Sequence, residues 1–311
     1  MEKNFDQIAL FTRSQAMELF HKGSVKDIYK SDKEGELIFS FSNRISVFDK
    51  PIPSEVPYKG EAINRCAAVW FDHCVDLCIP THFIGVEGKN TMRVKAIDIE
   101  RDYAKIPGRN NVLIPCEFIL RHYVAGSFLD RLKKGKITDP ELAKLNFADK
   151  LPEPYFETST KVEPVDRMID FDEAKRIAVL SDEDLGLIKN FTVRIDDELN
   201  RVAFDHGLVH VDGKKEFARN KDGKIMVIDV FGTPDEDRFW DLERFKKGEY
   251  VDLSKEHVRQ HYRDTGYKDE LYAARAAGKP EPEIPPMPEK LIKETSELYI
   301  DLFERLTGEK F

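Results

Sequence analysis

The stretch "DGKKEFARNKDGKIMVIDV", Asp212 to Val230, predicts a β-hairpin, because an Asp-Gly dipeptide between β-rich runs favours a two-residue turn. A turn at Asp222-Gly223 places Glu216 opposite Asp229 and Lys214 opposite Phe231. Side chains alternate along a strand, so Lys214 and Glu216 then lie on one face. Two opposed carboxylates repel each other unless a cation lies between them. The hairpin therefore indicates a Mg²⁺ site at Glu216 and Asp229, and solvated surface charges are the alternative.

Composition narrows the class of protein. The chain has 311 residues and a formal net charge of -9, which argues against a surface that grips nucleic acid. The N-terminus lacks the apolar core of a signal peptide, and no run reaches membrane-spanning length. We therefore expect a cytoplasmic protein with no nucleic-acid or membrane partner. Its cysteines, Cys66, Cys74, Cys78 and Cys116, contain no C-x-x-C pair, and buried free thiols are favoured over a metal site.

The order of elements predicts an α+β fold. Short β-rich runs over residues 20–50 precede a helix at about 61–79, and further β-rich runs follow. Residues 135–170 have little periodicity and predict a long surface loop. A long helix should begin at Ser181, with Asp184 completing a capping box, and should end at Gly207. A proline-rich connector, residues 278–290, leads to a final amphipathic helix that should dock on the body of the protein.

Three further stretches have the residue types of anion sites. "HKGSVKDIY" has a glycine turn between Lys22 and Lys26, where backbone N–H groups can approach phosphates. "RHYVAGS" offers Arg121 and Ser127 to a monophosphate, and "TPDEDRFWD" places Arg238 among aromatic residues as an anion clamp. The alternatives are a surface turn, a strand end and a packed arginine.

Together and in this order, the motifs resemble the phosphoribosylaminoimidazole-succinocarboxamide synthase (SAICAR synthetase) family. The resemblance covers most of residues 20–260 and includes "KGSVKDIY", "SNRISVFDKPIPSEVPYKGEAINR", "IPCEFILRHYVAGS", "TSTKVE", "LVHVDGKKEFA", "IDVFGTPDEDRFWD" and "KEHVRQ". So many ordered motifs make a chance similarity untenable.

The resemblance implies an ATP-dependent ligase of de novo purine biosynthesis. Such a ligase joins L-aspartate to the carboxylate of 5-amino-1-(5-phosphoribosyl)imidazole-4-carboxylate (CAIR) through an acyl phosphate, with Mg²⁺, and releases ADP and phosphate. The implied fold is two-lobed and related to ATP-grasp proteins, with an antiparallel N-terminal sheet, a larger α+β lobe and C-terminal helices. We expect a nucleotide-binding lobe over residues 1–114, a substrate and metal lobe over 115–250 and a helical segment over 251–311. A homo-oligomer is compatible with the sequence.

The resemblance also assigns roles to individual residues. It implies that ATP is bound by Lys22, Gly23, Ser24, Val25, Lys26, Lys95, Glu117 and Lys214, with Glu117 near the ribose. CAIR would be bound by Arg121, Ser127, Asp212, Arg238 and Arg259, and L-aspartate by Arg44, Ser46 and Lys161. Glu216 and Asp229 would bind the metal, and Lys214, Lys161 and Arg238 would be catalytic.

Two rival functions remain at this point. A kinase with a related nucleotide site would need a catalytic loop of the H-R-D-x-x-x-x-N type, and no such segment is present. A noncatalytic nucleotide-binding protein would have no need of the ribotide clamp formed by Arg121, Ser127 and Arg238.

Overall fold

The structure of the protein is a computed structural model that describes residues 18–23 and 25–311. Ser24, which the resemblance assigns to ATP, lies outside the described residues. An antiparallel N-terminal sheet contains, in spatial order, β1 (Leu19–Lys22), β2 (Lys26–Lys30), β3 (Glu36–Phe41), β7 (Thr91–Lys95) and β6 (Phe83–Gly88). Beside it, β4 (Arg44–Val47) and β5 (Lys50–Glu55) form a two-stranded ribbon.

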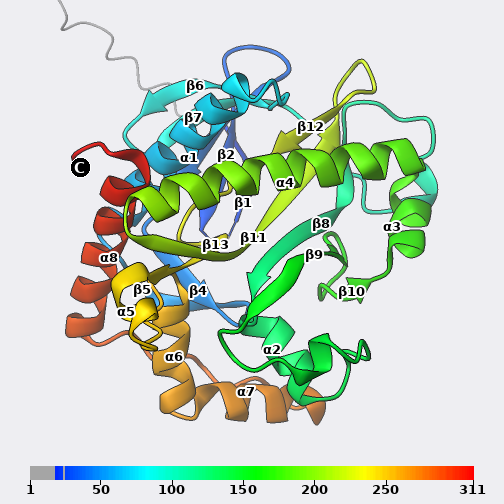
Figure 1. The fold of residues 1–311 in the computed structure, drawn as a ribbon. Coiled ribbons are helices and arrows are strands. Elements are labelled where there is room, and N and C mark those ends of the chain that lie inside the picture. The colour runs from blue at the N-terminus through cyan, green and yellow to red at the C-terminus, as the bar shows by residue number, and fades with distance from the viewer. Residues whose placement is uncertain (1–17, 24) are drawn as a thin grey trace, which may run out of the picture.

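A larger antiparallel sheet occupies the centre of the molecule (Figure 1). Its path runs through β10 (Met168–Ile169), β9 (Lys150–Thr160), β8 (Val112–Tyr123), β11 (Leu208–Arg219) and β12 (Ile225–Ile228), and β13 (Asp237–Asp241) also pairs with β11. The long strand β11 therefore has β8 on one side and both β12 and β13 on the other.

Helices cover these sheets and extend the C-terminal part of the chain. They are α1 (Lys59–Asp76), α2 (Gly126–Lys133), α3 (Phe171–Ala178), α4 (Asp182–Asp205), α5 (Leu242–Lys246), α6 (Glu256–Asp264), α7 (Tyr267–Ala276) and α8 (Glu289–Thr307), with 3₁₀ turns at Tyr103–Lys105 and Leu142–Lys144. In Figure 1, α4 crosses the face of the central sheet, where it contacts β8, β11 and β12. The red α8 lies against α1.

Several sequence predictions are confirmed. The mixture of antiparallel sheets and C-terminal helices is the predicted α+β fold. Helix α4 begins after Ser181, whose side chain and that of Asp184 form the predicted capping box, and Gly207 follows the helix with φ 74°. Helix α8 docks through a buried apolar stripe that consists of Leu291, Tyr299, Leu302, Phe303 and Leu306.

The predicted surface loop over residues 135–170 is wrong. The whole of β9 lies within it, and this strand pairs with β8 in the central sheet. Pro152 and Pro154 made this strand read as a loop in the sequence. They lie between Lys150 and Tyr155, the partners of Tyr123 and Arg121, where the register between β8 and β9 shifts. Because a proline lacks an N–H group, an irregular ladder accepts it more readily than a regular one.

The division at residues 114 and 250 stays a prediction. One core cluster spans the N-terminal sheet, α1, the central sheet, α4 and α8, and includes Phe41, Trp70, Phe118, Leu199 and Tyr299. Within residues 18–23 and 25–311, no helix combines the length and the apolar character needed to cross a membrane.

Candidate active site

Strand β11 sends charged side chains to both faces of the central sheet. Lys214 and Glu216 contact Glu117 of β8 on one face. Lys215 points to the other face, where its ammonium group contacts Asp196 of α4. This separation follows from the alternation of side chains along a strand, and it gives the sheet one open charged face and one buried one.

The hairpin between β11 and β12 differs from the prediction by one residue. Glu216 pairs with Ile228, and Arg219 pairs with Ile225. The prediction that Glu216 lies directly opposite Asp229 is therefore wrong. The pairing of Lys214 with Phe231 is also wrong, because β12 ends at Ile228.

The turn itself explains the shift. It contains three residues, 221–223, because the Asn220 N–H donates to the Lys224 carbonyl at 2.8 Å. The Asn220 side-chain oxygen accepts from the N–H groups of Asp222 and Lys224, each at 2.9 Å. Gly223 has φ 78°, as expected for the left-handed residue that completes a three-residue hairpin loop. A side chain outside the Asp-Gly dipeptide thus decides the register.

The carboxylate that faces Glu216 belongs to Glu117, on the neighbouring strand β8. Two lysines compensate this pair. The Nζ of Lys161 lies 2.7 Å from Glu216 and 3.2 Å from Glu117, and the Nζ of Lys214 lies 3.1 Å and 2.8 Å from the same two residues. Burial opposes ionisation of Glu117, but the two ammonium groups outweigh it and lower the pKa to about 2. The result is a compact group of fixed charges, with both lysines held protonated.

Asp229 lies in the loop after β12 and faces the same group of charges. Its backbone is left-handed, with φ 59°, and its N–H donates to Nε2 of the buried His82 at 3.2 Å. Its carboxylate pairs with Lys26 of β2. Burial opposes its ionisation, but Lys26 and Lys161 hold the pKa of Asp229 well below its usual range. The N-terminal sheet and the central sheet thus meet at this acid.

The glycine turn before β2 forms one wall of a cavity of about 260 Å³. The Gly23 N–H donates to the Lys26 carbonyl at 3.0 Å, and an added Cβ would lie 2.4 Å from that carbonyl oxygen. Only glycine therefore fits this turn. The cavity is also lined by Val25, Lys26, Phe41, Ile63, Lys161, Lys214, Asp229, Val230, Asp235 and Glu236.

The predicted anion clamp lines a second cavity of about 160 Å³. Arg121 donates to Ser127 at 3.0 Å and to Asp212 at 2.6 Å, and Arg238 donates to both oxygens of Asp212 at 2.8 and 2.6 Å. Burial opposes ionisation of Asp212, but the two guanidinium groups keep its pKa below the usual value. Arg259 lines the same cavity.

The two cavities share a wall made by Lys214, Asp235 and Glu236. The Nζ of Lys214 lies 3.1 Å from Glu236, so strand β11 and the loop after β12 meet at this wall. The glycine turn therefore lies on one side of Lys214, and a pair of arginines lies on the other. This arrangement suits the transfer of a group between two bound anions.

Comparison with known proteins identifies the family. The SAICAR synthetase family model matches residues 19–274, which is most of the chain. The chain belongs to the SAICAR synthetase family. It is therefore a ligase of purine biosynthesis, and neither the kinase-like nor the noncatalytic alternative finds support.

Relatives within the SAICAR synthetase family are similar over nearly their whole length. A phosphoribosylaminoimidazole-succinocarboxamide synthase from Thermoplasma acidophilum is 46% identical, and the alignment covers 95% of this chain and 100% of the relative. The enzyme of the same name from Thermoplasma volcanium is 43% identical, with the same coverage.

Solved structures of the SAICAR synthetase family share the fold. A SAICAR synthetase (Type-2) in complex with ADP aligns with a TM-score of 0.68 and 26% identity, covering 94% of this chain and 98% of the other. The Saccharomyces cerevisiae enzyme complexed with SAICAR aligns with a TM-score of 0.70 and 24% identity, covering 100% and 99% of the two chains. Because the identity to the Saccharomyces cerevisiae enzyme is only 24%, this second alignment shows a shared fold and nothing more.

Some residues that the family resemblance singles out lie outside both cavities. Lys22 is exposed at the end of β1, and the Nζ of the exposed Lys95 donates to the Thr81 carbonyl at 3.1 Å. Arg44 donates to Asp27 at 2.7 Å and to the Gly23 carbonyl at 3.0 Å, so it supports the glycine turn from behind. Ser46 lies in β4 and is not among the residues that line either cavity. Their roles in binding stay predictions.

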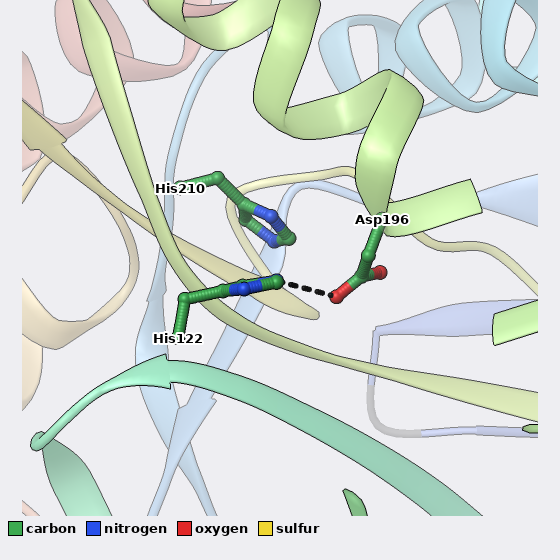
Figure 2. A group of neighbouring side chains, drawn as sticks. All are labelled: His122, Asp196 and His210. Atoms are coloured by element: carbon green, nitrogen blue, oxygen red, sulfur yellow. Dashed lines mark hydrogen bonds and ion pairs between the residues drawn. The ribbon is translucent and has the colours of Figure 1, made fainter. Parts of the chain in front are cut away.

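A buried cluster of His122, Asp196 and His210 lies on the far face of the central sheet. Figure 2 shows the two imidazoles and the carboxylate converging from β8, β11 and α4. The spacing would suit a metal, but the partners argue against one. Lys215 already neutralises Asp196, and both nitrogens of His210 have partners, Asn200 at 3.1 Å and Asp237 at 2.9 Å. We interpret the cluster as a structural network that stabilises the sheet.

Sequence reasoning missed several residues of the site. None of the sequence motifs singles out His82, yet its imidazole accepts a hydrogen bond from the backbone of Asp229. Asp235, Glu236 and Asp237 stand in the quoted motif "TPDEDRFWD", where only Arg238 was singled out. Three acids in a row before an arginine were a usable signal, because so many charges are rarely placed together beside a strand without partners.

Proposed function

We propose that the chain catalyses the SAICAR synthetase reaction on ATP, CAIR and L-aspartate, with Mg²⁺. The observation that supports this most is the wall shared by the two cavities. Lys214, Asp235 and Glu236 separate a phosphate-binding turn from an arginine clamp by the width of a few side chains. A nucleotide on one side and a ribotide on the other would then meet at Lys214.

In this proposal, ATP occupies the cavity beside the glycine turn. The backbone at Gly23 can approach phosphate oxygens because glycine has no side chain, and Lys26, Lys161 and Lys214 supply positive charge. A bound ADP in a related structure is consistent with this assignment. The Glu117 carboxylate, which contacts Lys161 and Lys214, would set the position of those lysines, and its contact with the ribose is a further proposal.

CAIR would occupy the cavity of the clamp. Its phosphate would take over hydrogen bonds that Arg121 and Arg238 now give to Asp212, while Ser127 adds a hydroxyl. A doubly charged phosphate competes well for guanidinium groups because the match is bidentate. Arg259 and Lys214 line the same cavity, so the CAIR carboxylate would face Lys214 in this proposal.

The residues present fit a magnesium ion. Glu216 and Asp229, with Glu117 nearby, offer the carboxylate oxygens that Mg²⁺ takes in nucleotide enzymes. Each acid is now paired with a lysine, and those lysines would be released to the phosphates. When bound, the ion would neutralise part of the negative charge on the ATP phosphates.

The chemistry follows from charge and position. A CAIR carboxylate oxygen attacks the γ-phosphorus of ATP, the bond to the ADP oxygen breaks, and an acyl phosphate forms. The amine of L-aspartate then attacks the acyl carbon, loses a proton and expels phosphate. Lys161 and Lys214 act as fixed cations in both steps, because the neighbouring acids raise the pKa of each lysine despite burial. Lys161, with Arg44 and Ser46 as weaker candidates, would also bind the aspartate carboxylates.

A coupled assay of ADP release tests this proposal. We expect ADP to form only when ATP, Mg²⁺, CAIR and L-aspartate are all present, in one-to-one ratio with the amide product. ADP release that does not depend on aspartate, or a preference for another amine, would overturn the assignment. Omitting CAIR alone serves as the control for simple ATP hydrolysis.

A further inference from the structure

Helix α8, near the C-terminus, contacts the wall that the two cavities share. Helix α8 lies beyond residues 19–274, which match the family model, and it follows the proline-rich connector. Its Tyr299 is fully buried, and the hydroxyl donates a hydrogen bond to Oδ1 of Asp235. Asp235 belongs to the wall that separates the two cavities.

Asp235 is held from two directions at once. Its other oxygen, Oδ2, accepts from Nζ of Lys59 at 2.8 Å, and Lys59 is the first residue of α1 and is also fully buried. The ammonium group of Lys59 lies 5.6 Å from the centre of the Tyr299 ring. Both carboxylate oxygens of Asp235 are thus fixed by side chains of two packed helices.

The charges make this contact a persistent one. Burial opposes ionisation of Asp235, but Lys59 and Lys255 outweigh it and keep the pKa of the carboxyl well below its usual range. Burial and the neighbouring carboxylate raise the pKa of Tyr299 well above that of a free tyrosine. The phenol therefore stays a donor and the carboxylate an acceptor near neutral pH.

Asp235 in turn sets the path of the loop. Residues 229–236 connect β12 to β13, and they carry Asp229 at one end and Glu236 at the other. Glu236 immediately follows Asp235, and its carboxylate lies 3.1 Å from Nζ of Lys214. A shift of Asp235 would therefore displace Glu236, which is one of the three carboxylates that hold Lys214.

We propose that Tyr299 is a positioning residue of the ligase reaction: through Asp235, it fixes the wall that sets the nucleotide and the ribotide in line. This inference rests on the proposed function. A residue that controls the relative position of two bound substrates affects the transition state more than the binding of either substrate alone.

The test compares Tyr299→Phe with Tyr262→Phe. Both tyrosines are fully buried and donate one hydroxyl bond, but the Tyr262 hydroxyl donates to the Pro285 carbonyl at 2.7 Å, away from the cavities. The steady-state rate of each variant should be divided by its concentration of folded active sites. That concentration is measured as the stoichiometry of ADP binding. We expect Tyr299→Phe to lower kcat on the order of tenfold with each KM changed less than about twofold. Tyr262→Phe should leave kcat unchanged.

A double-mutant cycle tests whether Tyr299 acts through Asp235. In an Asp235→Ala background, which removes both acceptor oxygens, adding Tyr299→Phe should lower kcat by less than about twofold. Equal kcat for Tyr299→Phe and Tyr262→Phe would overturn the inference, even if Asp235→Ala failed to fold. If the wild-type protein released no ADP with all substrates present, the proposed function would fail instead, so the two failures are distinguishable.

Discussion

Glu216 lies directly opposite Glu117 across the pair of strands β8 and β11, and the same two lysines contact both carboxylates. Like charges in this position would weaken a sheet on their own. Their position in the centre of the molecule supports the proposed site, in which a bound ligand would redistribute the positive charge of the two lysines. The pairing of these acids leads to the first prediction.

Glu216→Gln should abolish most turnover while the protein stays folded. The amide keeps the shape of the side chain and can still accept from Lys161 and Lys214, but it removes the charge proposed to bind Mg²⁺. We expect kcat to fall by about 100-fold and the Mg²⁺ concentration for half-maximal rate to rise.

The matched control is Glu153→Gln, on an exposed position of β9 in the same sheet. Both variants should melt within a few degrees of the wild type by circular dichroism. Wild-type turnover of Glu216→Gln at limiting Mg²⁺ would remove this acid from the metal site.

Gly126→Ala should weaken the binding of CAIR and spare that of ATP. Gly126 has φ 52°, and an added Cβ would lie 2.4 Å from Nη2 of Arg238, so the arginine would have to move away from the clamp. We expect KM for CAIR to rise on the order of tenfold, because a displaced guanidinium loses its bidentate contact with phosphate. KM for ATP should stay within about twofold.

Gly135→Ala separates the steric effect from backbone strain. Gly135 also has a positive φ, 64°, but an added Cβ would meet nothing within 4 Å. Both variants should lose about 1 kcal/mol of stability from the left-handed backbone. A rise in KM for CAIR of equal size in both would show that the contact with Arg238 is irrelevant.

The thiols should differ sharply in reactivity. Burial raises the pKa of Cys66, Cys74 and Cys116 to about 12 each, whereas Cys78 is exposed. Since the thiolate is the reactive form, we expect Ellman's reagent to label one thiol per native chain at pH 8. Raising the pH to 9 should add no further thiol, because the buried groups remain protonated.

Unfolding in urea should release all four thiols, and Cys78→Ser should leave the native protein unlabelled. Labelling of two or more thiols in the native state would contradict the burial of the other cysteines. The cysteines would then have to be accessible through opening of α1 or β8.

The sequence predicted the elements better than their register. Caps with local signals, such as Ser181 with Asp184, were placed correctly, because the interacting groups are three residues apart. The hairpin turn was misplaced by one residue, because the side chain of Asn220 competes with the preference of Asp222-Gly223 for a two-residue turn. A shift of one residue changes every cross-strand partner.

The candidate site was predicted only in part, because the sequence shows local motifs but not which distant residues contact each other. Arg121, Ser127, Asp212 and Arg238 do meet, as their motifs implied. The contact between Tyr299 and Asp235 joins residues 64 positions apart in sequence, and neither lies in a pattern that indicates the other. Such a contact depends on how α8 packs against α1, and sequence periodicity gives the buried face of a helix but not its neighbour.

Because the two faces of β11 carry different sets of contacts, this strand should not tolerate the insertion or deletion of a residue. Lys214 belongs to the open cavities, and the adjacent Lys215 belongs to the buried network with Asp196. Deleting one residue before Lys214 would turn Glu216 onto the buried face, where it would lie beside Asp196 as a second, repelling acid. Inserting one residue there would place Gly213 where Lys214 now lies and would put Lys215 in the place of Glu216. Natural variation in length should therefore be confined to the hairpin tip at 221–223, while β11 itself keeps a constant length among functional relatives.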